Sequence, residues 1–303
     1  MAIQLTLEKA AQFLQAAQDV LILAHKSPDG DTLGSGFGLL HALRGMGKRA
    51  WLACSDPIPP RYAYLTGGLT DAVWENGAGI VPQAVVAVDI ADTKLFGEKL
   101  RGFADKVQLC IDHHGSNTGY AQSLLLRPNA AANCELMLDL LEAMGLPLTE
   151  QIANCLYTGL VTDTGCFRHS STTVDSHRAA EKLLQAGADM RMIHRLAFES
   201  VSRGKVALLV EAMQQIRYEL DGRCAILVLP RDRINALGVA DDELEGIAAL
   251  PRQIEGVQVG VTLRQYKSYR GYKVSVRTDG IIDASAICAR LNGGGHRGAA
   301  GCN

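Results

Sequence analysis

Three side chains able to bind a divalent metal lie within seven residues of one another near the start of this 303-residue chain. They are His25, Asp29 and Asp31, in the segment AHKSPDGDTLGS, where Pro28 and Gly30 favour a sharp turn. One imidazole and two carboxylates suit Mn²⁺, Zn²⁺ or Mg²⁺ better than metals that prefer sulfur ligands. The alternative is an Asp-rich turn in which Asp31 caps the helix that follows.

Further candidate ligands follow two apolar segments. Asp89 comes directly after residues 84–88, and Asp112-His113-His114 comes directly after residues 107–111. Adjacent side chains of an extended chain point to opposite sides. We therefore expect one of the two histidines to bind a metal and the other to face a substrate phosphate, with Asp112 accepting a hydrogen bond that fixes a ring tautomer.

Two more aspartates, Asp163 and Asp92, could be either metal ligands or helix caps. Asp163, in the segment GLVTDTGCFRHS, follows a predicted helix, where a single Asp is more often a cap. Asp92 is better interpreted as the N-cap of a helix that begins near Thr93. The combined count decides for a metal centre, because two His and four Asp suffice for two metals that share one carboxylate. That arrangement clamps the attacking and leaving oxygens in phosphoryl transfer.

Short apolar strands alternate with helical patterns in the first half of the chain, which is typical of a mostly parallel, doubly wound sheet covered on both faces. The carboxyl ends of such strands form a ligand crevice, so His25, Asp89 and Asp112 should converge. The pattern predicts strands over 20–24, 84–88 and 107–111, and helices over 32–46, 133–144 (capped by Asn133 or a neighbour), 149–160 and 172–186.

The character of the sequence changes in the second half. We expect a first domain over 1–188, a polar helical connector over 189–217 that is interrupted near Ser202-Arg203-Gly204, and a smaller C-terminal α/β domain over 218–303. The connector leaves room for a homodimer contact. The C-terminal domain is predicted to contain strands over 224–229, 257–263 and 272–276 and helical segments over 241–250 and 283–291.

A glycine-rich segment over 292–301 is the last candidate site. Gly293, Gly294 and Gly295 would let backbone amides approach an anion closely. His296, together with Arg277 at the end of a predicted strand, can add charge-assisted contacts to a phosphate. A flexible tail is the alternative, but a histidine embedded among small residues favours a substrate-binding loop.

Composition excludes several classes of protein. The 30 Lys and Arg against 32 Asp and Glu give a net charge of −2, and 48% of residues are hydrophobic, which disfavours disorder and a protein that coats a long polyanion. No apolar run reaches the ~18 residues of a membrane span, and the N-terminus is unlike a signal peptide, so we expect a cytoplasmic protein without membrane contact. Eight cysteines without a C-x-x-C pair predict buried thiols rather than disulfides or a zinc ribbon.

These motifs together resemble those of the DHH phosphoesterase family, most of all its nano-RNase/pAp phosphatase branch. The resemblance covers nearly the whole chain. The chain ends seven residues after His296, which predicts a shortened C-terminal domain. The matching segments are His25-Lys26-Ser27-Pro28-Asp29-Gly30-Asp31, Val88-Asp89, Asp112-His113-His114 and Thr162-Asp163-Thr164-Gly165, with Gly293-Gly294-Gly295-His296 as in the C-terminal domain associated with this family.

The resemblance implies two divalent ions, most suitably Mn²⁺, and it assigns a role to each candidate residue. His114 and Asp112 would act at the substrate phosphate, while Arg277, His296 and the glycines would bind the rest of the substrate. One ion would be held by His25, Asp29 and Asp89, and the other by Asp31, Asp89, His113 and Asp163.

The activity implied is Mn²⁺-dependent hydrolysis of very short RNA, down to dinucleotides, and dephosphorylation of 3′-phosphoadenosine 5′-phosphate (pAp), with water bound between two metals as nucleophile. The near-neutral net charge argues against long nucleic acid as a partner. A phosphodiesterase for cyclic or linear dinucleotides is the main alternative. The Gly-His segment disfavours an inorganic pyrophosphatase or polyphosphatase, and the complete set of expected ligands disfavours a nucleotide-binding regulator with a degenerate site.

Overall fold

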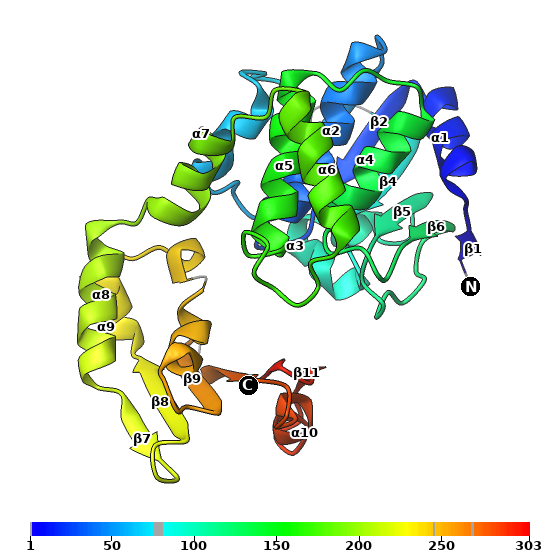
Figure 1. Cartoon of the computed structure of the whole chain (residues 1–303). Helices are drawn as coiled ribbons and strands as arrows, with labels where there is room; N and C mark the ends of the chain where they lie inside the picture. The colour runs from blue at the N-terminus through cyan, green and yellow to red at the C-terminus, as the bar shows by residue number, and fades with distance from the viewer. Residues whose placement is uncertain (1, 75–80, 245, 268–269) are drawn as a thin grey trace. The chain divides into compact units, whose positions relative to one another are not determined.

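The computed structural model describes residues 2–74, 81–244, 246–267 and 270–303. The chain forms two compact units, Met1–Glu199 and Ser200–Asn303. Each unit contains a six-stranded sheet with helices (Figure 1). The α/β class expected from the sequence is therefore confirmed in both halves of the chain.

The sheet of the first unit is parallel at every pairing between neighbouring strands. Its strand order is β1-β6-β5-β4-β2-β3. The central strands β2, β4 and β5 overlap the three predicted strands, whereas β1, β3 and β6 have no counterpart in the prediction. The strands are β1 (Ile3–Gln4), β2 (Asp19–Leu23), β3 (Arg49–Ala53), β4 (Ala84–Val88), β5 (Leu109–Asp112) and β6 (Ser123–Leu126).

Helices cover both faces of this sheet, as a doubly wound topology requires. Alternate residues of β2 pack into two separate cores: Val20 and Ile22 into one, Leu21 and Leu23 into the other. This explains why the strand is apolar at nearly every position. The larger core is closed by α1 (Leu7–Ala16), α2 (Gly30–Gly45), α4 (Asn133–Ala143), α5 (Glu150–Asp163) and α6 (Val174–Gln185), and the smaller one by the short helices η2 (Thr93–Phe96), α3 (Gly97–Leu100) and η3 (Arg101–Phe103).

The N-caps of three helices can be compared with the prediction. Asp29, not Asp31, is the N-cap of α2, because its carboxylate accepts the backbone N–H groups of Asp31 and Thr32 at 3.0 and 3.1 Å. The cap position of α4 is Ala132, a neighbour of Asn133 as the prediction allowed, and its side chain makes no capping hydrogen bond. The interpretation of Asp92 is confirmed: it caps η2 by accepting the Lys94 N–H.

Close packing of α2 against α5 depends on glycines. A Cβ on Gly34 would lie 2.4 Å from the carbonyl oxygen of Cys155, and a Cβ on Gly159 would lie 2.7 Å from Oδ1 of Asp31. Both distances are far below an ordinary van der Waals contact. The missing side chains therefore let α2 and α5 approach closely, and this approach brings Asp31 of α2 near the end of α5, where Asp163 lies.

The sheet of the second unit is mixed, in the order β11-β12-β10-β9-β8-β7. The glycine segment predicted as a loop is instead the edge strand β11, paired with β12. The segment predicted as helical over 241–250 forms only 3-10 turns, η5 (Asp241–Leu244) and η6 (Ile247–Gln253), separated at Gly246, which has φ of 80°. The other elements are β7 (Arg217–Glu219), β8 (Cys224–Leu229), β9 (Val259–Gln265), β10 (Tyr272–Thr278), β11 (Gly294–His296), β12 (Ala299–Cys302), α9 (Arg231–Ala236) and α10 (Ala284–Ala289).

The segment predicted as a connector is helical and broken near residue 202, as expected. It consists of α7 (Met190–His194), the π-helical turn η4 (Arg195–Glu199) and α8 (Arg203–Gln214). It is less polar than expected, because Val206, Val210 and Met213 on α8 are 45–53% exposed.

Two further expectations concern the whole chain. All eight cysteines are free, and five of them are buried, which confirms the prediction of thiols rather than disulfides. One more short helix, the 3-10 helix η1 (Pro60–Thr66), belongs to the first unit. Within the part of the chain that the structure describes, no helix has the length and apolar character needed to cross a bilayer.

Candidate metal centre

The predicted ligands meet at the carboxyl edge of the first sheet, where β2, β4 and β5 end. His25 follows β2, Asp89 follows β4, and His113 follows β5. Asp31 comes from the first turn of α2 and Asp163 from the last residue of α5. Three overlapping groups of potential ligands result: His25, Asp29 and Asp89; Asp31, His113 and Asp163; and Asp89, His113 and His114.

The first group surrounds the Nε2 atom of His25. This atom lies 3.5 Å from an oxygen of Asp29 and 3.6 Å from an oxygen of Asp89. The other ring nitrogen, Nδ1, is 2.8 Å from the carbonyl oxygen of Lys26. Because a carbonyl only accepts, Nδ1 carries a proton, which leaves the lone pair of neutral His25 on Nε2, facing the carboxylates.

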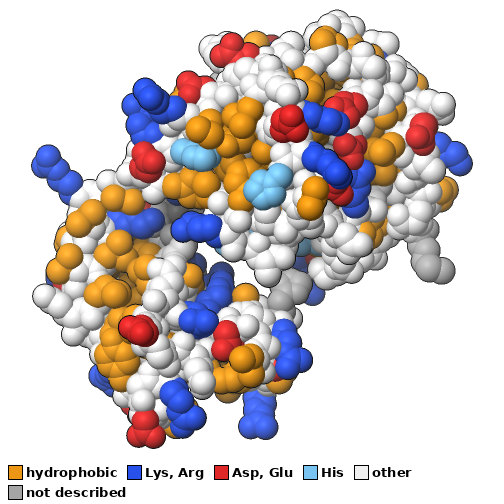
Figure 2. Space-filling view, in the orientation of Figure 1, with side chains coloured by type: hydrophobic (Ala, Val, Ile, Leu, Met, Phe, Trp, Pro, Cys, Tyr) orange, Lys and Arg blue, Asp and Glu red, His pale blue; other side chains and the backbone are white. Residues whose placement is uncertain are grey.

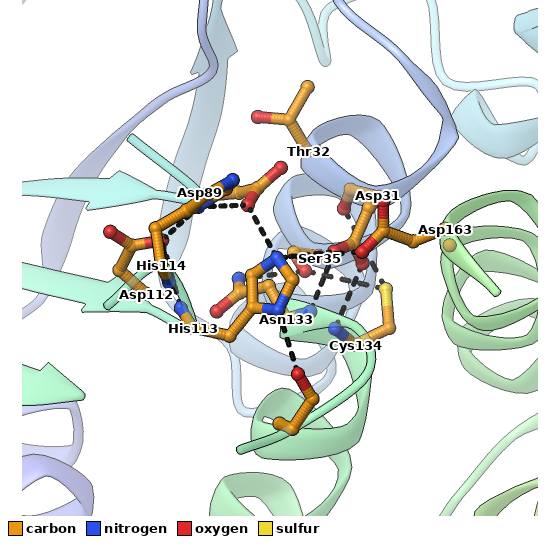
Figure 3. A network of polar contacts seen from close by, with 12 residues as sticks. Asp31, Thr32, Ser35, Asp89, Asp112, His113, His114, Asn133, Cys134 and Asp163 are labelled. Carbon is orange, nitrogen blue, oxygen red and sulfur yellow. Dashed lines mark hydrogen bonds and ion pairs between the residues drawn. The ribbon is translucent and has the colours of Figure 1, made fainter. Parts of the chain in front are cut away.

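The second group is built in the same way around His113, as Figure 3 shows. Its Nδ1 donates to the carbonyl oxygen of Ala130 at 3.0 Å. Its Nε2 faces one oxygen each of Asp31, Asp89 and Asp163, at 3.7, 3.5 and 3.5 Å. Two ligand atoms that each lie about 2.1 Å from a common ion are about 3.0–3.5 Å apart, so this spacing is close to that of a ligand set.

Asp31 is held in place by a helix other than the one that contains it. Its two carboxylate oxygens accept the backbone N–H groups of Asn133 and Cys134, at 2.6 and 3.0 Å, at the start of α4 (Figure 3). The positive end of a helix favours such a negative charge. Asp31 is therefore a cap, but for a helix about 100 residues further along the chain, and its carboxylate still faces His113.

Both histidines of the Asp112-His113-His114 motif lie beside Asp89, which contradicts the expectation that they point to opposite sides. The Nε2 of His113 is 3.5 Å and the Nδ1 of His114 is 3.4 Å from the same oxygen of Asp89. The reason is that β5 ends at Asp112, whose carboxylate accepts the backbone N–H groups of both histidines and so takes them out of the extended conformation.

The two histidines are nevertheless held differently. The Nδ1 of His114 donates to Asp112 at 2.8 Å, so the nitrogen nearest Asp89 is already committed to Asp112. Asp112 is fully buried, and its second oxygen accepts a hydrogen bond from the side chain of Asn117 at 2.6 Å. Asp112 thus orients His114 through Nδ1, as expected for one of the two rings, and leaves Nε2 free to contact a substrate.

Burial and neighbouring charges raise the pKa values of carboxylates and imidazoles alike in this cluster. Burial, with the nearby carboxylate of Asp31, raises the pKa of Asp89 to about 7 and that of Asp163 to about 8. Burial opposes the charge of His25, yet the adjacent Asp29 and Asp89 raise its pKa to about 11. The hydrogen bond to Asp112 raises the pKa of His114 to about 9. Carboxylates crowded in this way need positive charge to ionise together.

One buried oxygen tests whether a cation fits here. Oδ1 of Asp89 is buried and has no hydrogen-bond donor among the residues that the structure describes, although a buried carboxylate oxygen is costly to leave without a partner. It lies 3.5 Å from Nε2 of His113 and 3.4 Å from Nδ1 of His114, and the other oxygen of the same carboxylate lies 3.6 Å from Nε2 of His25. Oxygen and imidazole donors suit Mn²⁺, Mg²⁺ or Zn²⁺. The residues therefore fit the ligand chemistry of a divalent ion.

Several supporting residues escape analysis of the sequence. Asn117 orients Asp112, and the side chain of Asn133 donates to Ser35 beside Asp31. Asn117 lies five residues after Asp112, a spacing that by itself carries no signal.

A hollow of about 570 Å³, which shares no residue with the ligand groups, lies on the surface near α6 and α7, where Figure 2 shows apolar side chains beside histidines. Its lining includes Tyr157, Phe167, His177, Leu184, Met190 and His194.

The candidate substrate residues of the second unit lie on adjacent strands. Arg277 of β10 and His296 of β11 both pair with Ala299 of β12, one on each side, so the three residues form one row across the sheet. Gly293 and Gly295 have a packing role, because a Cβ on either would lie within 2.6 Å of a carbonyl oxygen of β12. Gly294 has open space around it.

Known proteins show the same two-part organisation. Residues 19–160 match the N-terminal domain of the DHH family and residues 222–303 match the DHHA1 domain. A bifunctional oligoribonuclease and PAP phosphatase, NrnA, from Thermus thermophilus is 32% identical over 294 residues, which cover 96% of this chain and 86% of that protein. A cyclic-di-AMP phosphodiesterase, GdpP, from Geobacillus thermodenitrificans is 27% identical over 94% of this chain but only 44% of its own length.

A solved structure shares the fold over nearly the whole chain. It belongs to an exopolyphosphatase-related protein from Bacteroides fragilis, with a TM-score of 0.87 and 23% identity, and the match covers 98% of this chain and 90% of the other. Three observations point to the same family: the metal-ligand motifs, the parallel sheet that brings them together, and the matches over both units. The chain therefore belongs to the DHH family of phosphoesterases and combines a DHH domain with a DHHA1 domain.

Proposed function

We propose that this protein is a divalent-metal phosphohydrolase that degrades very short RNA oligonucleotides to mononucleotides and removes a phosphate from pAp. The observation that carries the proposal is the 32% identity to an oligoribonuclease and PAP phosphatase over 96% of the chain. The ligand groups that share Asp89 supply a site for the chemistry. Both activities are hydrolyses of a phosphate ester, so one metal centre can serve them.

Two metal ions, which we propose to be Mn²⁺, would supply an activated water and neutralise charge on the phosphate. His25, Asp29 and Asp89 would hold one ion, and Asp31, Asp89, His113 and Asp163 the other. The tautomers support this division, because the lone pairs of His25 and His113 face the carboxylates. His114 would contact the phosphate through Nε2, with Asp112 holding the ring and favouring its protonated form.

The sheet of the second unit would bind the remainder of the substrate. Arg264 and Lys273 are directly opposite on β9 and β10, and Arg277 follows Lys273 by four residues, on the same face of β10. Burial and the charges of Arg264 and Arg277 lower the pKa of Lys273. Like charges placed opposite one another are unfavourable, so this basic group would be stabilised by an anion such as a terminal phosphate.

A substrate panel with Mn²⁺ tests the proposal. Dinucleotide and pAp should be hydrolysed faster than longer RNA, cyclic dinucleotide and pyrophosphate. Arg277→Ala and His296→Ala should slow hydrolysis of dinucleotide and pAp at least ~10-fold. Both should leave bis-p-nitrophenyl phosphate, which is too small to need the remote contact, almost unaffected. Equal loss on the small ester, with metal content intact, would contradict the binding role.

A phosphodiesterase for cyclic or linear dinucleotides is the second candidate. It is favoured by the 27% identity to a cyclic-di-AMP phosphodiesterase, although this chain spans less than half of that protein. The same panel separates the candidates: preferential hydrolysis of cyclic dinucleotide over pAp would favour the second.

Partners and location extend the proposal. Short oligonucleotides, rather than long nucleic acid or membrane, are the proposed partners, and a cytoplasmic location stays a prediction that cell fractionation would test.

A homodimer would use the exposed apolar stripe of α8 formed by Val206, Val210 and Met213. Light scattering of the wild type should give a mass near 65 kDa, twice the 32.5 kDa of one chain, and Val210→Asp should lower the measured mass towards that of the monomer. A wild-type mass equal to that of one chain would refute the dimer.

A further inference from the structure

The turn that follows Asp163 has a strained backbone. Gly165, Cys166 and Phe167 have φ of 56°, 58° and 62°, so three successive residues lie in the left-handed region. Residues other than glycine rarely adopt this conformation. Strain of this kind persists where the surrounding structure imposes it, often at functional sites. The residues that this turn positions are therefore candidates for a function.

Thr164 holds the turn together. It is fully buried. Its carbonyl oxygen accepts the backbone N–H groups of Arg168 and His169, both at 3.0 Å, and its hydroxyl oxygen accepts the N–H of Phe167 at 3.1 Å. These bonds return the chain over the carboxyl end of α5. Arg168 and His169 are thereby brought back beside Asp163.

Arg168 and His169 are exposed to solvent, and the side chain of each is held by one hydrogen bond to the backbone of the turn. The Nδ1 of His169 donates to the carbonyl oxygen of Asp163 at 2.9 Å, and its ring occupies the space of a missing side chain, since a Cβ on Gly165 would be 2.3 Å from Nε2. Arg168 donates from Nε to the carbonyl oxygen of Gly165 at 2.7 Å. No carboxylate among the described residues pairs with its terminal nitrogens.

Charge balance gives these two residues a role. The carboxylates of Asp29, Asp31, Asp89 and Asp163 would offset the charge of two divalent ions, so a bound phosphate needs further cations and hydrogen-bond donors. His114, two residues after the end of β5, would supply one such donor. At the end of α5, the exposed guanidinium of Arg168 has the planar donor pair that phosphate prefers, and the imidazole of His169 is adjacent.

We propose that Arg168 and His169 form a phosphate-contacting arm beside Asp163, which completes the anion site that His114 begins. The arm rests on the proposed function, because its ligand is the scissile phosphate of the same substrates. Arg168 would bind two phosphate oxygens, and His169 would add a contact from its second ring nitrogen. The strained turn serves to hold both residues at the metal centre.

The test compares Arg168→Ala, Arg168→Lys and His169→Asn with wild type. Asn can retain the hydrogen bond to the carbonyl oxygen of Asp163 but lacks the second ring nitrogen, so it separates a structural role from a phosphate contact. Arg178→Ala is the matched control, because Arg178 is an exposed arginine of α6 that pairs with Asp175. Mn²⁺ content, Kd for pAp by calorimetry with Ca²⁺ in place of Mn²⁺, and kcat/KM with Mn²⁺ are measured for each.

Arg168→Ala and His169→Asn should keep wild-type Mn²⁺ content, bind pAp at least ~10-fold more weakly and lose about 10²-fold in kcat/KM. Arg168→Lys should recover part of the binding. Variants within twofold of Arg178→Ala in both Kd and kcat/KM, or variants that lose Mn²⁺, would overturn the arm. Wild type that binds pAp without hydrolysing any substrate would refute the proposed activity, while the Kd comparison still decides the arm. Absence of pAp binding by wild type would overturn both.

Discussion

Replacing Gly34 by Ala should damage the metal centre from a distance. The new Cβ would lie 2.4 Å from the carbonyl oxygen of Cys155, about 1 Å short of the 3.4 Å at which ordinary contact begins. That oxygen belongs to the backbone of α5, so no side chain can rotate away. The two helices must therefore separate by about 1 Å, and Asp31 and Asp163 move apart with them.

The expected cost is about 1–3 kcal/mol of stability, as for other overpacked cores. Function should suffer more, because metal–ligand distances tolerate only about 0.2 Å and a misplacement of about 1 Å can cost ~10²-fold in rate. Urea unfolding followed by circular dichroism gives the stability, and calorimetric titration with Mn²⁺ gives the metal affinity. Both should fall in Gly34→Ala.

A second glycine of the same helix is the control. A Cβ on Gly45, the last residue of α2, would meet nothing within 4 Å, so Gly45→Ala should raise stability by about 0.5–1 kcal/mol and leave the affinity for Mn²⁺ unchanged. If Gly34→Ala matched wild type in both stability and Mn²⁺ affinity, close packing of α2 on α5 would not be what positions Asp31, and the reasoning would be refuted.

Three further predictions concern the ligands themselves. Asp89→Asn should abolish hydrolysis of every substrate with an unchanged circular dichroism spectrum, because Asn tolerates the left-handed φ of 58° at this position; turnover near wild type would contradict the shared carboxylate. His113→Ala should lose metal, whereas His114→Ala should keep metal and lose about 10²–10³ in turnover; equal metal loss by elemental analysis would count against this division. In chelator-treated protein, Asp89 and Asp163, with pKa values raised to about 7 and 8, keep protons that the unfolded chain has released. Stability should therefore fall as the pH rises from about 4 to 8. Added Mn²⁺ should raise Tm more at pH 8 than at pH 6, because ligand protons no longer compete, and the reverse order would disprove this assignment of protons.

Residue types and local pattern were sufficient to predict the three central strands of the first sheet and the convergence of the residues that follow them. The strands at 20–24, 84–88 and 107–111 are apolar at almost every position, which marks strands buried on both faces. In parallel topology their carboxyl ends share one edge. This rule alone brings His25, Asp89 and His113 together, and it needs no knowledge of how the helices pack.

Tertiary structure decided what depends on contacts between residues far apart in the sequence. Asp31 caps α4, because its carboxylate accepts the backbone N–H groups of Asn133 and Cys134, which lie about 100 residues further along the chain. Its distance from Asp163 follows from glycines of two different helices, and no local pattern records which glycine faces which neighbour. These contacts are invisible in the sequence because the partner is chosen by packing.

The same reason explains the two errors that matter most for function. His113 and His114 were expected on opposite sides by the rule for extended chains, but the buried carboxylate of Asp112 binds both N–H groups and ends the strand before them. Gly294–His296 were expected in a loop, but pairing with Ala299–Cys302 makes them an edge strand. In both cases a hydrogen bond that only the folded chain can form overrides the local preference of the residues.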